Sequence, residues 1–214
     1  MDITQLCHPF PHVILGNFYS NEELIHIWKE LDFLTYFGKL EEPEKTGSAI
    51  GQEGLLLKSN YAIQLDDLYK HRDISNILRL NRKLFSDQLV NLVGSTDFIF
   101  EGFSNFNEDR TMVSYYENSH HYAAHQDRCS YTALTWFFKD PKKFSGGDLY
   151  FPNYDYIHEI QSNQTLIFPS FVKHQVTEVI MDPQETGILG SMSGLGRYCM
   201  TQFCIHNFCR PRHA

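Results

Sequence analysis

Apolar residues near the N-terminus recur at the spacing of an amphipathic helix. The residues at positions i, i+3, i+4 and i+7 are Leu24, Ile27, Trp28 and Leu31. Ser20 and Glu23 have the spacing of a capping box, so the predicted helix begins directly after Ser20. A short strand over 13–15 and a turn at 16–17 are predicted before it, because β-branched residues lead into a Gly-Asn pair.

A second helix is predicted from about 73 to 93. Its buried side would consist of Ile74, Ile77, Leu78, Leu84, Phe85, Leu89 and Leu92. Between the two helices, residues 38–54 contain four glycines, a proline and several charges, which is the composition of a loop. Both a plain surface loop and a lid beside a functional site fit this composition.

From residue 97 onward the hydrophobic pattern changes to that of strands. Short runs rich in β-branched and aromatic residues alternate with turn residues. The predicted strands are 98–100, 112–116, 132–138, 148–151, 165–168, 175–179 and 198–203. Closely spaced strands of this kind favour two packed antiparallel sheets, a jelly roll, with the preceding helices bracing one sheet. The predicted fold class is therefore α+β.

Length and composition fit a single domain. The chain has 214 residues, 42% of them hydrophobic, and neither repeats nor a composition break mark a linker. We expect one domain over 1–214, with helical support mainly in 20–93 and a jelly-roll core over about 97–208.

Charge and cysteine usage restrict the partners and the setting. The formal charge of −8 disfavours a phosphate backbone as partner, but is compatible with peptides, amino acids or other small molecules. Five cysteines without a CxxC pair, and no signal-peptide pattern, predict a reduced, cytoplasmic setting. No apolar run approaches the ~20 residues that span a bilayer, so we expect a soluble protein. The sequence does not indicate an oligomeric state.

His125-Gln126-Asp127, with His174 further along the chain, forms a candidate metal site. Residues i and i+2 of a strand point to one side, so His125 and Asp127 are predicted to converge on one ion. His174 would then come from a distant strand folded back beside the first. Two imidazoles and one carboxylate leave three coordination positions open, which is typical of non-haem iron(II) oxygenases.

Three further motifs follow in a fixed order. SGGDLYF (145–151) is a tight turn that leads into a strand, and TLIFPSFVKHQVTEV (165–179) delivers His174 just after a turn. GRYCMTQF (196–203) is a strand that begins with an arginine.

Together these motifs resemble the iron(II)- and 2-oxoglutarate-dependent dioxygenases, and within them the prolyl-hydroxylase-like group. The family patterns YxxxxxYxxHxD, GGxLxF, FxSxxxHxV and RYxxT correspond here to 116–127, 146–151, 168–176 and 197–201. The opening PFPHVILGNFYS (9–20) is similar to the first strand of many members. The resemblance covers nearly all the chain and is densest from 112 to 203. It implies a double-stranded β-helix as the jelly-roll core.

The resemblance also implies chemistry and cofactors. Iron(II) would be bound by His125, Asp127 and His174, with 2-oxoglutarate and O₂ as co-substrates and ascorbate as a further candidate cofactor. The implied reaction hydroxylates an unactivated C–H bond, first of all in a prolyl residue of a peptide or protein, and decarboxylates 2-oxoglutarate to succinate and CO₂. Alternatives are the same chemistry on a free amino acid, a small molecule or an alkylated nucleobase, and a non-catalytic metal-binding module.

Several residues receive roles beside the metal. Arg197 would pair bidentately with the far carboxylate of 2-oxoglutarate, since a guanidinium matches a carboxylate in geometry. Thr201 shares the face of Arg197 on a strand, and either Tyr116 or Tyr115 would donate its phenol to the same carboxylate. The candidate substrate-side residues are Tyr122, Arg128 and Trp136. No catalytic residue beyond the metal centre is expected.

Other residues of the chain could also bind a metal, and the sequence departs from the family pattern at two places. His120 and His121 fall in a predicted turn, and the residues Cys204, His206, Cys209 and His213 have a spacing unusual for zinc. Residues 181–196 form a longer connection than the family has, interpreted as an inserted loop at the substrate entrance. Ser119 and His120 stand where many relatives have glycine.

Overall fold

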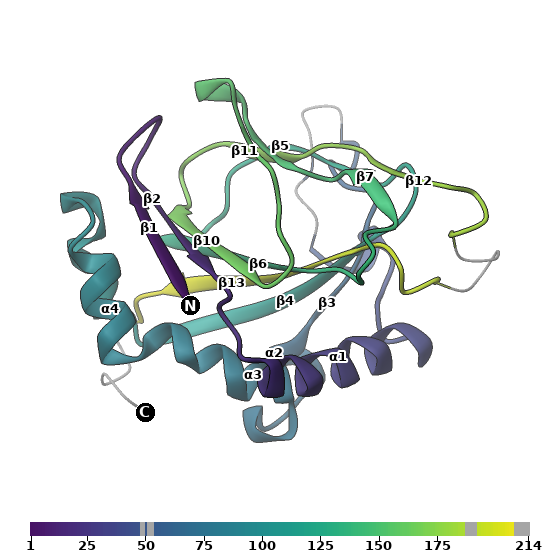
Figure 1. Ribbon diagram of the computed structural model, residues 1–214, viewed down its shortest axis with the longest axis horizontal. Helices are drawn as coiled ribbons and strands as arrows, with labels where there is room; N and C mark the ends of the chain where they lie inside the picture. The colour runs from purple at the N-terminus through teal and green to yellow at the C-terminus, as the bar shows by residue number, and fades with distance from the viewer. Residues whose placement is uncertain (48–49, 51–53, 187–191, 208–214) are drawn as a thin grey trace.

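A seven-stranded antiparallel sheet lies at the centre of the protein, with helices on one face and smaller sheets on the other (Figure 1). The computed structural model describes residues 1–47, 50, 54–186 and 192–207. In sheet order the strands are β1 (Asp2–Leu6), β2 (His12–Gly16), β10 (Gln164–Pro169), β6 (Tyr131–Phe137), β13 (Arg197–Ile205), β4 (Glu108–Tyr116) and β3 (Tyr61–Gln64). The sheet therefore joins the predicted N-terminal strand to the C-terminal half of the chain.

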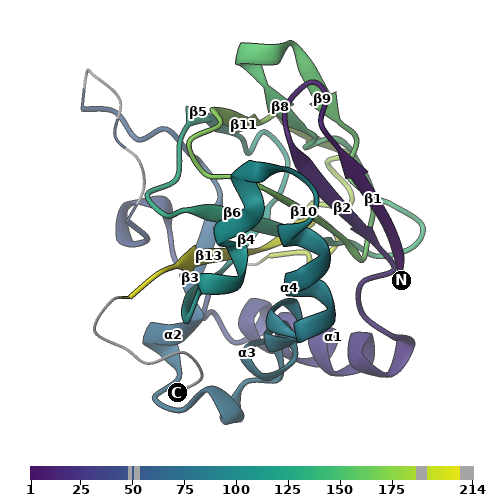
Figure 2. The same cartoon turned by 90° about the vertical axis from the view of Figure 1, so that its left-hand side faces the viewer.

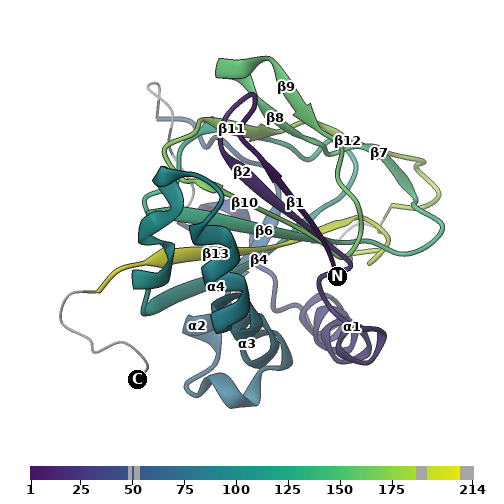
Figure 3. The same cartoon turned by 60° about the vertical axis from the view of Figure 1, so that its left-hand side comes forward.

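A four-stranded sheet faces the inner side of this large sheet (Figure 3). Its strands, in order, are β5 (Tyr122–His125), β11 (His174–Val176), β8 (Leu149–Phe151) and β9 (Tyr156–His158). Beside it, β12 (Val179–Met181) pairs with β7 (Phe144–Gly146). Two facing antiparallel sheets confirm the predicted jelly-roll core of an α+β fold.

Strand alternation in β4 and β13 separates two hydrophobic clusters, one on each face of the large sheet. Val113 and Tyr115 of β4, like Tyr198 and Met200 of β13, pack toward the helices. Residues between them face the space enclosed by the two sheets, because successive side chains of a strand point to opposite faces. One face of the large sheet thus anchors it, and the other lines the interior.

The predicted first helix is confirmed as α1 (Asn21–Tyr36). The Ser20 side chain accepts a hydrogen bond from the Glu23 backbone, and the Glu23 carboxylate accepts one from the Ser20 backbone. Its predicted apolar face packs on the sheet, with Ile27 and Leu31 fully buried. None of the described helices has the length and apolar character that a membrane span requires.

The prediction of one helix over 73–93 is wrong. The chain forms four short helical segments, η2 (Arg72–Ile74), α3 (Asn76–Leu80), η3 (Asn81–Phe85) and α4 (Asp87–Gly94). Ser75 and Ser86 precede two of them in extended backbone conformations, and the Ser75 hydroxyl accepts a hydrogen bond from the Leu78 backbone. At Ser75 the capping side chain favours a new helix end over helix continuation, whereas Ser86 interrupts the helix through its extended backbone without a side-chain cap. Ile74, expected on the buried side, is 65% exposed.

Two strand predictions also need correction. Residues 98–100 belong to a 3₁₀-helix, η4 (Phe98–Asn105), in which Phe100 and Phe103 are buried at i and i+3. Its start is capped by the Asp97 carboxylate, which accepts a hydrogen bond from the Ile99 backbone. The predicted strand 175–179 is divided between β11 and β12, which lie in different sheets. The helices together cover the outer face of the large sheet (Figure 2).

A two-glycine turn between β7 and β8 holds the smaller sheets against the large one. Gly146 and Gly147 both have positive φ angles, of 64° and 70°. A Cβ atom on Gly146 would lie 2.1 Å from the Glu178 carbonyl oxygen, and one on Gly147 would lie 2.9 Å from Cδ of Arg197. Only glycine permits both the left-handed backbone and this close approach.

We predict that Gly146→Ala destabilises the protein far more than Gly38→Ala. Both positions are left-handed, but a Cβ on Gly38 would meet nothing within 4 Å. The conformational penalty alone is about 1–2 kcal/mol, and backbone crowding at Gly146 adds roughly 1–3 kcal/mol. Urea denaturation of the two variants measures the difference in the free energy of unfolding. Equal losses would contradict the role assigned to the turn.

Candidate metal centre and its cavity

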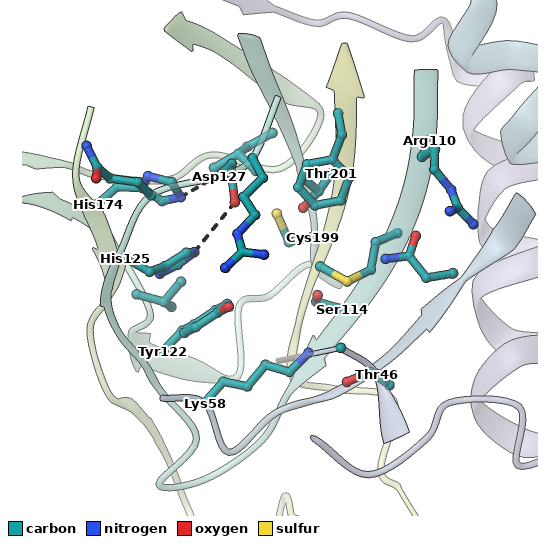
Figure 4. A pocket seen from close by; sticks show the side chains of 18 of the residues that line it. Thr46, Lys58, Arg110, Ser114, Tyr122, His125, Asp127, His174, Cys199 and Thr201 are labelled. Atoms are coloured by element: carbon teal, nitrogen blue, oxygen red, sulfur yellow. Dashed lines mark ion pairs between the residues drawn. The ribbon is translucent and has the colours of Figure 1, made fainter. Parts of the chain in front are cut away.

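His125, Asp127 and His174 converge in the space between the sheets (Figure 4). One candidate ligand atom from each residue lies within 4.8 Å of the others. Nε2 of His125 is 3.8 Å from Oδ1 of Asp127, and Nε2 of His174 is 3.6 Å from Oδ2. Two metal–ligand bonds of about 2 Å span such separations, so the three side chains could hold one ion.

The strand pairing that places these residues was predicted in part. His174 begins β11 directly opposite His125 in the antiparallel register, as expected of a strand folded back beside the first. β5, however, ends at His125, so Asp127 lies beyond the strand and the predicted i, i+2 strand alternation is wrong. The Asp127 backbone is held instead by a hydrogen bond that it donates to the Ser170 carbonyl.

Neighbouring groups fix the orientation of all three side chains. Nδ1 of His125 lies 2.9 Å from the Ala123 carbonyl, and Nδ1 of His174 lies 3.0 Å from the Val172 carbonyl. A carbonyl only accepts, so each Nδ1 donates and each Nε2 keeps its lone pair for a metal. Thr132 donates its hydroxyl to Oδ2 of Asp127 at 2.6 Å.

Burial keeps the first histidine in the form that binds metal. Desolvation, with His174 nearby as the next contribution, lowers the pKa of His125 to about 4. Its imidazole is therefore neutral at pH 7, and only a neutral imidazole offers a lone pair to an ion.

The triad borders a cavity with a volume of about 780 Å³. Alternate residues of two neighbouring strands form its wall, namely Arg110, Met112, Ser114 and Tyr116 of β4, and Arg197, Cys199, Thr201, Phe203 and Ile205 of β13. Leu149 and Val176 contribute from the smaller sheet, and Thr46, Gly47 and Ile50 from the glycine-rich loop. The cavity thus follows the whole length of β4 and β13.

Arg197 is fully buried in this cavity and lacks a protein partner. None of its three guanidinium nitrogens makes a hydrogen bond within the described part of the chain. The Tyr116 ring lies 4.7 Å from the guanidinium carbon, which is an attractive contact but not a counter-charge. A buried charge without a carboxylate partner is costly, so the side chain is suited to an anionic ligand.

The two neighbouring tyrosines face opposite sides of the sheet. Tyr116 lines the cavity, and burial raises the pKa of its phenol well above the usual value, so the phenol remains a donor. Tyr115 packs in the helix-side cluster, and its hydroxyl donates to the Glu117 carboxylate. The structure therefore brings Tyr116 to Arg197 and directs Tyr115 away. Thr201 lies two residues beyond Cys199 on the same wall.

The substrate-side candidates divide in the same way. Tyr122 and Arg128 line the cavity, and the Tyr122 ring stacks on His125 with centroids 3.7 Å apart. Trp136 is instead fully buried and stacks on His158, and it is not among the residues that line the cavity. It serves as core packing.

The competing metal-binding residues do not join the triad. Nδ1 of His120 accepts a hydrogen bond from the Glu117 backbone, while His121 is exposed beside Ser59. Among the residues that the structure describes, His125, Asp127 and His174 are the group whose ligand atoms converge. Cys209 and His213 of the considered zinc cluster lie outside the described residues.

Of the two departures from the family pattern, the serine at position 119 has a structural explanation. Ser119 has a φ angle of 68°, the left-handed conformation that glycine adopts most easily. The described residues of 181–196 do not line the cavity, and Ser193 contacts Glu117 and Tyr115 on the helix side. The described residues of this connection thus do not support its predicted place at the substrate entrance. Residues 187–191 lie outside the described part of the chain.

Sequence reasoning missed three residues of the site. Thr132 and Ser170 share a hydrogen bond of 2.9 Å behind Asp127, and Lys58 lines the cavity from the segment before β3. Ser170 lies inside the recognised FxSxxxHxV pattern, which is a signal for its place. Lys58 and Thr132 reach the site through tertiary pairing that no local pattern indicates.

Comparisons with known proteins agree with this architecture. No family model matches the sequence, and no curated protein matches it. A prolyl-4-hydroxylase structure from Pseudomonas putida superimposes with a TM-score of 0.60 at 14% identity, over 92% of each chain. An oxidoreductase of the 2OG-Fe(II) oxygenase family from Burkholderia pseudomallei gives a TM-score of 0.59 at 12% identity, over 95% of this chain and 89% of the other.

A third similar structure is a viral collagen prolyl hydroxylase from Paramecium Bursaria Chlorella virus-1 in a 2OG complex. It superimposes with a TM-score of 0.51 at 11% identity, over 93% of this chain and 98% of the other. The superpositions establish a shared fold, and identities this low establish nothing beyond it. The resemblance inferred from the sequence is therefore confirmed for the fold. The chain has the fold of the iron(II)- and 2-oxoglutarate-dependent oxygenases, with prolyl hydroxylases among its structural neighbours.

Proposed function

We propose that the protein is an iron(II)- and 2-oxoglutarate-dependent oxygenase that hydroxylates an unactivated C–H bond. The observation that carries this proposal is one cavity lined both by a two-histidine, one-carboxylate group and by a buried Arg197 that has no hydrogen-bond partner among the described residues. Two imidazoles and one carboxylate suit iron(II) and leave open positions for further ligands. The unpaired guanidinium requires an anion, which a dicarboxylate provides.

The donor set fits the proposed cofactors in charge as well as in type. His125, Asp127 and His174 would hold the ion, and the Asp127 carboxylate would leave a net charge of +1 there. Arg197 would bind the far carboxylate of 2-oxoglutarate, because its planar fork matches two carboxylate oxygens. When bound, iron(II), 2-oxoglutarate and O₂ supply the oxidising chemistry, with succinate and CO₂ as co-products.

Other residues of the lining would position the co-substrate. Tyr116 and Thr201 line the wall next to Arg197 and offer hydroxyl groups to the same carboxylate. Burial raises the pKa of the Cys199 thiol, so it stays neutral between them. Thr132 holds the Asp127 carboxylate, which fixes the face that Asp127 presents to the ion.

A prolyl residue in a peptide is the substrate that we propose first. Two of the similar structures are prolyl hydroxylases by name. From Arg197 to Ile205 the cavity wall follows a strand of nine residues, or on the order of 26 Å at about 3.3 Å per residue. 2-Oxoglutarate would fill only the Arg197 end, which leaves the rest for an extended chain.

The alternatives receive less support. A non-catalytic metal-binding module has no use for a buried guanidinium without a partner, yet Arg197 is fully buried. An alkylated nucleobase in a nucleic acid would meet a protein with a formal charge of −8, which disfavours a polyanion. A free amino acid would fit the same chemistry and is the second candidate.

Anaerobic addition of iron(II) and 2-oxoglutarate tests the proposal directly. We expect a weak metal-to-ligand absorption band in the visible range, and succinate after O₂ is admitted. Mass spectrometry of candidate prolyl peptides would then detect a +16 shift. If neither the band nor succinate appeared, the proposed oxygenase function would be wrong.

We predict that His174→Ala abolishes the iron(II) complex. The substitution removes one of three protein ligands, so the absorption band should disappear. Loss of a residue that only hydrogen-bonds a metal ligand typically lowers metal affinity by about 10- to 100-fold, so loss of a ligand itself should lower it by more than about 100-fold. His121→Ala is the matched control, because this histidine is exposed and outside the triad. If both variants formed the band equally, the metal site would lie elsewhere.

We also predict that Arg197→Met weakens 2-oxoglutarate binding while leaving the ligand-free protein no less stable. A charge-assisted hydrogen-bonded pair contributes roughly 1.5–3 kcal/mol, or about 10- to 150-fold in Kd. Without ligand the variant loses only an uncompensated buried charge, so its free energy of unfolding should be equal or higher.

Titration of the iron(II) absorption band and urea denaturation measure the two quantities for Arg197→Met. Arg79→Met, on an exposed position of α3, is the control for charge removal. An unchanged Kd would show that another group holds the carboxylate.

A further inference from the structure

Lys58 is tied by its backbone to the strand that carries a metal-ligand candidate. Lys58 forms an isolated antiparallel bridge with Tyr122 of β5. The Ser59 backbone donates to the His121 carbonyl at 3.1 Å, and the Ala123 backbone donates to the Leu57 carbonyl at 2.6 Å. The segment 57–59 thus extends the edge of β5, and Lys58 has a fixed place relative to the triad.

The side chain of Lys58 is buried and directed into the cavity. It is 5% exposed and lines the same cavity as His125 and Arg197. Figure 4 shows its stem running beside Tyr122 and its amino group pointing toward Ser114. Nζ lies 5.9 Å from the centre of the Tyr122 ring, which itself stacks on His125.

The ammonium group of Lys58 has no counter-charge within the described part of the chain, where no carboxylate lies within ion-pair distance of Nζ. Burial lowers the pKa of Lys58 to about 8, which reflects this uncompensated desolvation. A lysine buried without a partner costs stability, and an anionic ligand beside it would recover that loss.

Apart from the exposed Arg128, the other charged groups that the proposal must account for have partners or assigned ligands. Arg110 pairs with Asp67 at the rim, and under the proposed function Asp127 faces the iron and Arg197 faces 2-oxoglutarate. The carboxylate of 2-oxoglutarate at the metal end is neutralised by the ion. Once iron and 2-oxoglutarate are assigned to their residues, Lys58 is the buried cation of the described lining that still has no anionic partner.

We propose that Lys58 binds a carboxylate of the substrate, so that the protein selects a C–H bond next to an acidic group. The proposal rests on the proposed oxygenase function, since it assigns Arg197 to the co-substrate. The acidic group is either a side chain or terminus of a peptide, or the carboxylate of a free amino acid.

A carboxylate suits this site better than a phosphate. One ammonium matches the single charge of a carboxylate, whereas phosphate sites usually combine several donors such as arginine forks or helix N-termini. The described lining supplies a single lysine at this point, with Arg128 at the exposed rim. The net charge of −8 also opposes the approach of polyanions.

Two pairs of probes test the proposal on the full chain loaded with iron(II) and 2-oxoglutarate. The first pair is acetyl-Gly-Pro-Glu-amide and acetyl-Gly-Pro-Gln-amide, and the second is proline and prolinamide. Succinate formation in O₂ gives the probe concentration for half-maximal stimulation. Protection of Lys58 from acylation, measured anaerobically by mass spectrometry, gives binding without turnover.

We expect a carboxylate probe to act at a concentration at least 10-fold lower than its amide twin. Lys58→Met should abolish this preference, Lys58→Arg should keep most of it, and the Kd of 2-oxoglutarate should change less than twofold in both variants. The peptide pair and the amino-acid pair reveal which source provides the carboxylate. The absorption band of the iron complex in each variant verifies that the site is folded.

Several results would overturn the assignment. The assignment would be wrong if the acid and amide probes acted at equal concentrations. It would also be wrong if neither carboxylate series protected Lys58 from acylation, or if only a nucleoside monophosphate protected it. A large rise in the Kd of 2-oxoglutarate in Lys58→Met would instead make Lys58 a co-substrate ligand. A different result would contradict the oxygenase proposal itself: the unmodified protein would then show no absorption band with iron(II) and 2-oxoglutarate.

Discussion

The burial of the Arg197 guanidinium is the physical constraint on which the architecture of the site depends. Its nitrogens lack partners among the described residues, so the folded chain holds a charge that only a ligand can match. Gly147 leaves the room for its stem, and Tyr116 covers the guanidinium. This buried charge costs stability locally, and the rest of the fold must compensate.

The compensation lies on the other face of the same strands. Tyr198 and Met200 alternate with the cavity-facing residues of β13 and are fully buried against the helices. Burying side chains of this size contributes about 1.5–3 kcal/mol each, which exceeds the usual net gain of a hydrogen bond. The helix-backed face can therefore hold the strand in register while the opposite face carries polar and charged groups.

The sequence predicted the parts of the site that local patterns encode. His125, Asp127, His174 and Arg197 stand in short motifs whose spacing is set by turns and strands, and the structure gathers them in one cavity. Lys58 could not be found in this way, because it reaches the cavity by pairing with a strand more than sixty residues later in the chain. The single helix predicted over 73–93 failed for a related reason: the hydrophobic spacing does not reveal that the backbone becomes extended at Ser75 and Ser86 and divides the segment.

The placement of charge also bears on which ligands the cavity accepts. An acidic molecule repels anions at long range, and this repulsion grows with the charge of the anion. Inside, Arg197 and Lys58 are shielded from solvent, so each attracts a carboxylate strongly at short range. A small dicarboxylate and a singly charged substrate, the ligands proposed above, would meet only a weak long-range repulsion, whereas a long polyanion would be repelled along its whole length. Under the proposed function, the combination of a negative net charge and buried cations would therefore favour small acids and short acidic peptides over nucleic acids.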